Sequence, residues 1–449
     1  MEQDLTQGSI SKVLLRFVLP FLAASILQFL YSVVDMMIVG QFADAAAISA
    51  VNTSGQIMQL ITGLISGIAT GGTVLIGQHV GAKRYSSVSS VAQALLALCL
   101  GLGVLLTVLF LAGNHFIISV MQVPAAAVIP AQDYLRITSL GILFIAGYNG
   151  ISAILRGLGD SKRPMYFVGC SCILNILGDL LLVGGFRMGA AGAALATMLS
   201  QAVACILALL FLLRGTLPFP FSCNPRKAQP AIMGQVLHLG IPLAAQDVLV
   251  NLSFVMITAI VNHMGLTQSA AVGVVERIIG FGMLIPIAFL SALSAFTAQN
   301  VGACELERTK SGLKLSILLC LIVTGVFTGV IECFPGAVSK LFTSDRDVVS
   351  NCILYLRTYS LDILMVSFVF CFNGFFSGYG KTTFTMLNCV LSTFLVRVPL
   401  VYLFSILPNT SLLLIGIAAP TASLVQIVMQ LIYYRAGSWK RIKLASETQ

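Results

Sequence analysis

The chain has 449 residues, of which 58% are hydrophobic and only 9% are charged, whereas about 25% of the residues of an average soluble protein are charged. A water-soluble fold of this length could not cover its surface with so few charges. The roughly 260 apolar residues suffice for about a dozen membrane helices of about 20 residues each. The composition therefore excludes a cytosolic enzyme, a nucleic-acid-binding protein and a secreted disulfide scaffold, and the net charge of +9 requires no acidic partner.

Charges, prolines and polar clusters divide the chain into twelve apolar segments. Each is long enough to cross the hydrocarbon core as a helix, where an open sheet could not pair its backbone groups. We therefore expect an all-α membrane protein with twelve transmembrane helices. In chain order, the predicted spans are 13–39, 49–76, 88–113, 134–155, 165–186, 189–213, 236–262, 270–298, 315–333, 352–376, 384–407 and 412–434.

Lysine and arginine are unevenly distributed between the two sets of connections. Of the 25 basic residues, 18 lie at the N-terminus, in every second connection or at the C-terminus, three lie in the opposite connections and four lie within spans. Cytoplasmic segments next to membrane helices are enriched in Lys and Arg. The sequence therefore predicts a multi-pass membrane protein with cytoplasmic termini, and we expect its setting to be a bacterial inner membrane.

The two halves of the chain resemble each other at a fixed offset. The segment 78–82 (QHVGA) recurs as 299–303 (QNVGA), 221 residues later, and the same offset relates 134–136 (YLR) to 355–357 (YLR). Pro20 corresponds to Pro242 at an offset of 222. Agreement over separated blocks indicates a tandem duplication of a six-helix unit. Because six is an even number, both copies enter the membrane in the same direction and form two parallel-related lobes.

The predicted domains are an N-terminal lobe at 1–213, a linker at 214–234 and a C-terminal lobe at 235–449. The linker contains four prolines together with Arg226 and Lys227, so we expect it to lie on the cytoplasmic side. In transporters built from such repeats, the substrate path lies between the repeats, and access alternates between the two sides of the membrane.

Ionisable side chains inside apolar spans are the strongest functional signal, because an Asp at the centre of a membrane helix costs about 2.5 to 3.5 kcal/mol. In the first span, Asp35 follows Tyr31 by one helical turn, and Gln28 lies near this pair along the chain. Pro20 lacks a backbone donor and should bend the same helix. A carboxylate hydrogen-bonded between helices for structural reasons is the alternative to a functional role.

A second acidic pattern lies in the fifth span, where Asn175 and Asp179 share one helical face. An amide and a carboxylate here, together with the carboxylate of Asp35, supply oxygen ligands of the kind that a hard cation such as Na⁺ prefers. The same carboxylates can instead bind and release a proton. The two spans therefore predict a site for a small cation or a proton.

The second half carries polar and charged residues in a different pattern. The candidates there are Gln246, Asp247, Glu276 and Asp362. Glu276 and Arg277 point about 100 degrees apart on a helix, so each can pair with another helix, and Asp362 can be neutralised by a nearby arginine. Arg397 aligns near Asn175 through the repeat, which gives the second lobe a different charge from the first.

Two parallel six-helix repeats, the segment 31–40 (YSVVDMMIVG), the loop 78–82 and the segment 189–197 (GAAGAALAT) together resemble the multidrug and toxic compound extrusion (MATE) transporters. The resemblance covers nearly the whole chain. It is greatest to the branch of the DNA-damage-inducible F (DinF-like) transporters. The NorM-type branch instead places a key acid early in the seventh span, and this sequence does not show that pattern clearly.

The resemblance implies a cation-coupled exporter with its polar cluster in the first lobe. Binding of a proton or of Na⁺ at this cluster would change the first helix and help to expel the substrate. The coupling residues it implies are Asp35, Asn175, Asp179 and Thr197, which are also the possible Na⁺ ligands. The cavity or supporting residues it implies are Tyr31, Asn149 and Pro20, to which Gln28 is added from its position near Asp35.

We therefore expect a monomeric secondary active antiporter that exports amphipathic, often cationic compounds in exchange for Na⁺ or H⁺. No other cofactor, no nucleic-acid partner and no enzymatic activity are expected, and membrane lipids are the expected surroundings. A flippase for a lipid or lipid-linked substrate is the alternative, although few Lys and Arg lie within the spans to hold phosphate groups. A membrane-embedded enzyme would need a nucleophile and base or a metal site, and a channel would conduct without substrate exchange.

Overall fold

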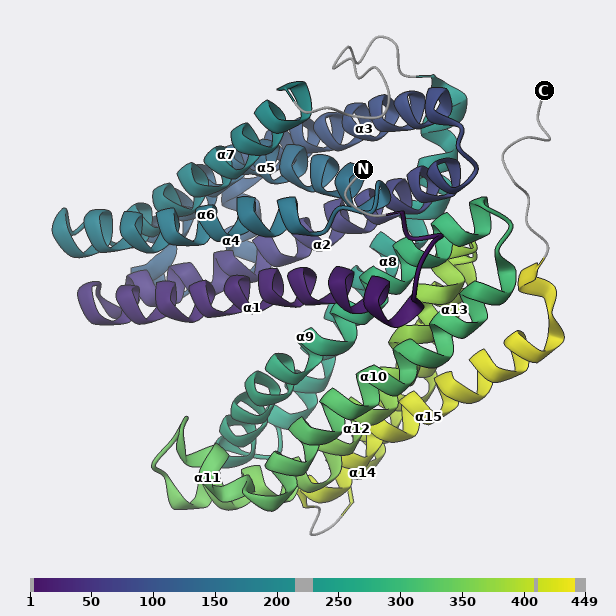
Figure 1. The fold of residues 1–449 in the computed structure, drawn as a ribbon. Coiled ribbons are helices and arrows are strands. Elements are labelled where there is room, and N and C mark those ends of the chain that lie inside the picture. Colours follow the sequence, from purple (N-terminus) through teal and green to yellow (C-terminus); the bar gives the residue numbers. More distant parts are fainter. Residues whose placement is uncertain (1–3, 215–228, 408–410, 441–449) are drawn as a thin grey trace. The chain divides into compact units, whose positions relative to one another are not determined.

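The computed structural model describes residues 4–214, 229–407 and 411–440 (Figure 1). Within these ranges the regular structure is entirely helical, and twelve helices are long and apolar enough to cross a membrane. The predicted all-α membrane fold with twelve spans is confirmed. Residues 215–228 of the predicted linker lie outside the described residues.

The helices extend beyond the predicted apolar segments at most ends, because backbone hydrogen bonding continues into the polar flanks. The first half contains α1 (Ile10–Phe42), α2 (Ala45–Gly81), α3 (Tyr85–Ala112), the short α4 (Asn114–Val120), α5 (Val128–Gly157), α6 (Lys162–Asp179) with the π-helical segment Leu180–Gly185, and α7 (Gly189–Arg214). The second half contains α8 (Pro230–Asn262), α9 (Leu266–Gly302), α10 (Leu306–Cys333), the short α11 (Pro335–Lys340), α12 (Arg346–Gly378), α13 (Thr382–Ser392) with the π-helical segment Thr393–Arg397 and α14 (Val398–Ser405), and α15 (Leu412–Ala436).

Equivalent helices pack in the same pairs in both halves: α2 with α5 and α9 with α12, and α5 with α7 and α12 with α15. One close contact between helices occurs in both halves. A Cβ atom on Gly157 would lie 2.6 Å from Cγ2 of Ile76, and one on Gly378 would lie 2.5 Å from Cβ of Thr297. Both glycines and both neighbours are 221 positions apart, so the contact recurs at the offset found in the sequence.

The chain forms two compact units. The leading segment of α1, up to Val18, belongs to the second unit, and the leading segment of α8, up to Ala244, belongs to the first. The first unit contains Leu19–Ala244, and the second contains Leu5–Val18 and Ala245–Gln449. The change of unit therefore falls beside Pro20 on α1 and beside Pro242 on α8, the two prolines that correspond in the repeat. Each proline lacks the N–H that an internal helical residue would donate, so the helix is locally weakened at both points.

Side chains of the second unit bind the backbone just before α1, which belongs to the same unit. The backbone N–H of Leu5 donates to Oε1 of Gln299 at 3.2 Å, and Nδ2 of Asn300 donates to the carbonyl oxygen of Leu5 at 3.2 Å. Nη1 of Arg308 donates to the carbonyl oxygen of Gly8 at 2.8 Å. Two of these three residues belong to the recurring segment 299–303, which thus has a structural role in the second half.

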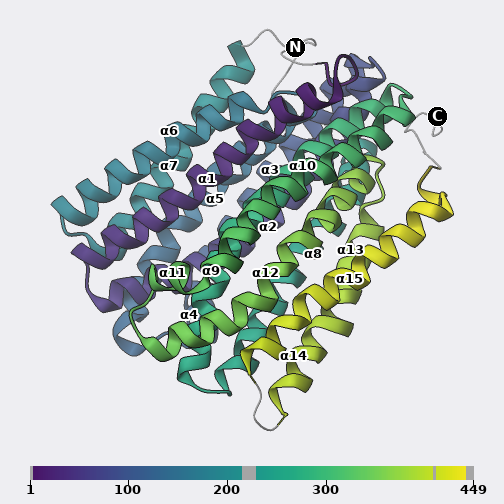
Figure 2. The same ribbon diagram turned by 60° about the horizontal axis from the view of Figure 1, so that its bottom comes forward.

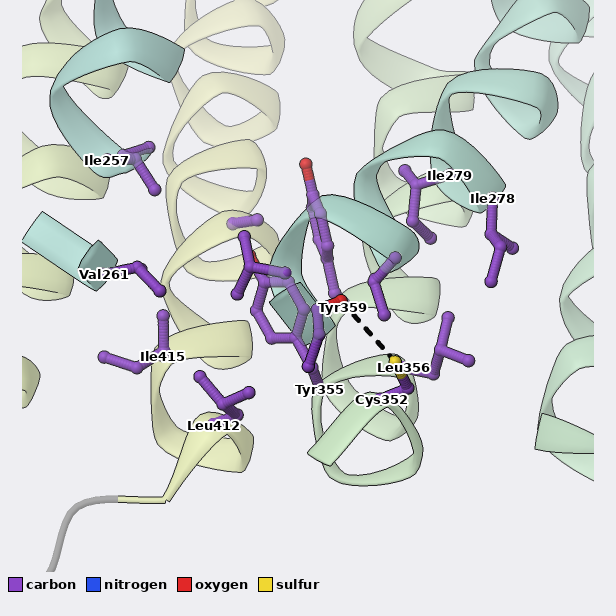
Figure 3. Close-up of a cluster of buried hydrophobic side chains, with 14 of the residues drawn as sticks. Ile257, Val261, Ile278, Ile279, Cys352, Tyr355, Leu356, Tyr359, Leu412 and Ile415 are labelled. Atoms are coloured by element: carbon purple, nitrogen blue, oxygen red, sulfur yellow. Dashed lines mark hydrogen bonds between the residues drawn. The ribbon is translucent and has the colours of Figure 1, made fainter. Parts of the chain in front are cut away.

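The core of the second unit is an apolar cluster centred on α12. The helix α12 packs against α9, α10 and α15 (Figure 2). Figure 3 shows Tyr355 and Tyr359 of α12 lying among aliphatic side chains of the cluster. The rings of Tyr355 and Tyr359 are 5.1 Å apart. This packing fixes the orientation of α12, which also carries Asp362. The labelled aliphatic neighbours are Ile257, Val261, Ile278, Ile279, Leu356, Leu412 and Ile415.

Candidate functional site

Asp35 on α1 and Asp179 at the end of α6 meet in the first unit, where their carboxyl groups lie within hydrogen-bonding range of each other. Asp179 is fully buried and Asp35 is half-buried. An ionised carboxylate has only acceptor atoms, so two ionised carboxylates at this separation repel each other. A proton or a small cation between their oxygens would remove this repulsion.

Four buried oxygens of this cluster accept no hydrogen bond from an N–H or hydroxyl group in the described part of the chain. They are Oδ1 of Asp35, Oδ1 of Asn175 and both carboxylate oxygens of Asp179. About 90% or more of buried polar atoms in proteins are hydrogen-bonded, so four such oxygens from three neighbouring residues are unusual. A set of carboxylate and amide oxygens is the ligand type that binds hard cations.

Asn175 lies one helical turn before Asp179 and is also buried. Its Nδ2 donates to Oγ1 of Thr197 on α7 at 3.3 Å. This bond fixes the amide through its donor end, so that Oδ1 remains an acceptor in the cluster. The structure thus brings together Asp35 with Asp179 and Asn175 with Thr197, all four of the predicted coupling residues.

Small residues explain why α6 and α7 approach so closely at this point. A Cβ atom on Gly178 would lie 2.9 Å from Cβ of Ala196, and these residues immediately precede Asp179 and Thr197. After Asp179 the chain continues as the π-helical segment Leu180–Gly185. A π-helical turn shifts the backbone hydrogen bonds from i→i+4 to i→i+5, and such turns are frequent at functional sites.

Two tyrosines lie near the acidic pair, and a cysteine lies near one of these tyrosines. Tyr31 lies within electrostatic range of Asp35, Asp179 and Cys172, and Tyr134 on α5 lies within range of Tyr31 and both acids. Tyr31 was predicted from its spacing, whereas Tyr134 and Cys172 were not. Cys172 precedes Asp179 by two helical turns and so shares its face. The sequence gives no comparable signal for Tyr134 beyond its recurrence as Tyr355.

The remaining first-lobe candidates lie apart from these contacts. Gln28 is exposed, and Asn149 is half-buried with its Nδ2 donating to the carbonyl oxygen of Ile145 in its own helix at 2.9 Å. Within the described residues, neither side chain hydrogen-bonds to the acidic cluster. Pro20 lies inside α1 at the change of unit rather than at the acids.

The second-lobe candidates do not form a copy of this cluster. Asp247 is exposed, and Oε1 of Gln246 is buried without a donor among the described residues. Asp362 is buried and accepts a hydrogen bond from Oγ of Ser423 at 2.5 Å. The arginine whose charge reaches both Glu276 and Asp362 is Arg397. It lies on a different helix from either acid.

Thr197→Val should weaken the site without disturbing the fold. The substitution keeps the shape of the side chain but removes the oxygen that holds the amide of Asn175, so we expect the predicted gradient-driven transport to fall by roughly 5-fold, the effect of about 1 kcal/mol. The matched control is Thr421→Val, whose hydroxyl donates to the carbonyl oxygen of Ile417 in its own helix at 2.8 Å. Equal transport by the two variants in proteoliposomes would contradict the predicted coupling role of Thr197.

Comparison with known proteins gives the family. The MatE family profile matches residues 20–181 and, a second time, residues 242–403. The chain belongs to the MatE family. Both matched segments begin at one of the two equivalent prolines, Pro20 and Pro242, so the profile detects the same duplication as the internal repeat. The predicted MATE membership is confirmed, and the assignment to the DinF-like branch stays a prediction.

Relatives of this MatE protein match it over nearly its whole length. The probable multidrug resistance protein YpnP of Bacillus subtilis is 28% identical over 445 residues, which cover 99% of both chains. The probable multidrug resistance protein NorM of Thermotoga maritima is 24% identical, with 96% of this chain and 94% of the relative covered. A MOP superfamily transporter from Pyrococcus furiosus shares the fold, with a TM-score of 0.91 and 22% identity over 97% of this chain and 98% of the other. The chain is therefore a multi-pass membrane transporter and not an enzyme.

Proposed function

We propose that this MatE protein is a secondary active exporter of amphipathic, often cationic compounds, which it exchanges for Na⁺ or H⁺. The observation that carries the proposal is the acidic cluster of the first unit, where Asp35, Asp179 and Asn175 present four buried oxygens that have no donor among the described residues. Relatives named as multidrug resistance proteins support the class of substrate.

The exchange would use α1 as the moving element. A proton or cation that enters between Asp35 and Asp179 removes their repulsion and draws α1 towards α6, and its departure has the opposite effect. Because α1 changes unit beside Pro20, a shift at Asp35 acts on a helix whose leading segment packs in the second unit. A coupling ion can shift this equilibrium only by the difference between its affinities for the two states.

The proposed setting is a bacterial inner membrane with both termini in the cytoplasm, and the protein acts as a monomer. The excess of Lys and Arg in alternate connections supports this orientation. The recurring segments QHVGA and QNVGA, the first of which was expected to be a loop, form the helical ends of α2 and α9. In the proposed orientation, these ends and the connections that follow them lie on the cytoplasmic side.

Transport in proteoliposomes tests the proposal. Purified protein is reconstituted with a fluorescent cationic dye, and inward Na⁺ and H⁺ gradients are imposed separately at zero membrane potential. We expect one of the two gradients to drive dye movement and the other to be without effect. Dye movement that responds to neither gradient would contradict exchange. Gradient-independent movement of a labelled phospholipid would favour the flippase.

A further inference from the structure

The second unit contains a charged cluster that the proposed exchange does not use. Arg397 ends the π-helical segment Thr393–Arg397, and its Nη2 donates to the hydroxyl oxygen of Tyr359 at 2.9 Å. The guanidinium carbon lies 4.6 Å from the ring centre of Phe254 and 5.7 Å from that of Tyr359. A hydrogen bond and two aromatic faces thus hold this cation within the bundle.

Two acids face this arginine from other helices. Asp362 on α12 is 4% exposed and accepts from Oγ of Ser423, and Glu276 on α9 is half-buried. The charge of Arg397 reaches both carboxylates, although the described residues contain no direct ion pair between them. Buried carboxylates without a counter-charge are costly, and Arg397 is the cation that compensates this pair.

The repeat shows that the two units carry complementary charge patterns. In the first helix, where the offset is 222, Asp35 corresponds to Ile257, and at the offset of 221 Asp179 corresponds to Leu400, so the second unit lacks both coupling acids. In the opposite direction, the positions equivalent to the second-unit charges are apolar in the first unit. Glu276, Asp362 and Arg397 correspond to Gly55, Gly141 and Ile176.

A common local feature accompanies these different charges. In each unit the charge lies at a π-helical segment: Asp179 directly precedes Leu180–Gly185, and Arg397 ends Thr393–Arg397. The acids Asp35 and Asp179 of the first unit have unpaired oxygens and no basic partner in the described contacts. In the second unit, Glu276 and Asp362 share a resident arginine.

We propose that Arg397 is a tethered counter-cation: it neutralises the carboxylates of the second unit, as an exchangeable ion neutralises those of the first. Guanidinium groups do not lose their proton in proteins, so Arg397 stays charged throughout a transport cycle and cannot be exchanged. Glu276 and Asp362 then need no external cation. Arg397 thereby acts as a specificity-determining residue that confines cation exchange to the first unit. This last consequence rests on the proposed function, but the charge compensation does not.

The charge compensation is tested by a mutant cycle read as the melting temperature of the purified protein. Arg397→Gln keeps a hydrogen-bond donor for Tyr359 but removes the charge, and we expect it to lower the melting temperature by several degrees. The triple variant Arg397→Gln, Glu276→Gln, Asp362→Asn should regain most of that loss, because all three charges are then removed together. Additive effects would overturn the proposal. If Arg397→Gln alone fails to fold, recovery of folded protein in the triple variant supports it equally.

The consequence for ion exchange is tested with the first-unit acids neutralised. In the Asp35→Asn, Asp179→Asn background, Na⁺ should leave the melting temperature unchanged compared with choline. Adding Arg397→Gln should create a Na⁺-dependent rise of about 1.5 °C at ten times the dissociation constant, as an ion fills the vacated position. The matched control is Arg277→Gln, an exposed arginine next to Glu276, which should create none.

The two experiments separate failure of this inference from failure of the proposed function. A Na⁺ response in the acid-neutralised background with Arg397 intact, or none after Arg397→Gln, would overturn the tethered counter-cation. A non-additive mutant cycle in a protein whose dye transport ignores both gradients would contradict the exchange mechanism and leave the assignment of Arg397 intact.

Discussion

Asp179→Asn is expected to abolish most gradient-driven export and, at the same time, to raise the thermal stability of the protein. An amide cannot take up or release a proton and does not attract a cation, so the coupling between ion and substrate should fall by about 5- to 150-fold. Stability should rise because the new Nδ2 supplies a donor to a cluster in which four buried oxygens have none. Dye export in proteoliposomes and the melting temperature in detergent are measured on the same preparation.

Export is expected to fall while thermal stability rises, and these opposite changes make the prediction specific. A carboxylate that served only to hold helices together would lower both stability and transport when replaced. The matched control is Asp133→Asn, whose carboxylate is half exposed and pairs with Arg136 at 3.8 Å, and this variant should leave both quantities unchanged. Asp35→Asn should behave like Asp179→Asn, because either substitution places a donor between the two side chains. Wild-type export by Asp179→Asn would contradict the coupling role.

Sequence alone predicts those features of this transporter that follow from hydropathy and spacing. The membrane imposes a minimum length on every span, so twelve apolar segments translate directly into twelve helices. A buried carboxylate is costly in an apolar span, so Asp35 and Asp179 stand out without any knowledge of their neighbours. The helical period also places Tyr31 on the face of Asp35 and Asn175 on that of Asp179.

The partners of these residues could not be predicted, because helix periodicity does not determine which faces of different helices meet. The proximity of Asp35 to Asp179 depends on the packing of α1 beside α6, and Tyr134 joins the cluster from α5. In the same way, Arg357 is the nearest arginine to Asp362 along the span, whereas Arg397 is the one that faces it. Neither π-helical segment has a distinctive composition, so their positions beside the charges emerge only from the folded backbone.

The exchange of leading segments between the units depends equally on close backbone contacts, which the positions of small residues permit. On α2, a Cβ atom at Gly71 would lie 2.6 Å from the backbone nitrogen of Gly240 on α8, and one at Gly67 would lie 2.4 Å from that of Ala244. Glycine and alanine at a spacing of four allow membrane helices to approach in this way, and the gain is van der Waals contact rather than hydrophobic burial. The leading segment of α8 therefore packs on α2 of the first unit through direct contact between the two backbones.

Gly71→Leu is consequently expected to be among the most damaging single substitutions in this protein. The atoms that the new side chain meets are backbone atoms, which cannot rotate away, so α8 must move off α2. We expect a loss of about 3 kcal/mol or more in stability, at the upper end of the cost of overpacking. The measurements are the melting temperature and the yield of monodisperse protein on size-exclusion chromatography, with dye export measured on any folded fraction.

Gly55→Leu on the same helix is the matched control, because a Cβ atom at Gly55 would meet nothing within 4 Å. Replacing a helical glycine at an open position should stabilise the helix by up to about 1 kcal/mol. The two variants therefore change stability in opposite directions, although the residue types, the helix and the added volume are the same. If Gly71→Leu melts within a degree of Gly55→Leu, α8 is not held by backbone contact with α2. The first residues of α8 would then be held by side chains, as the backbone just before α1 is held by Gln299, Asn300 and Arg308.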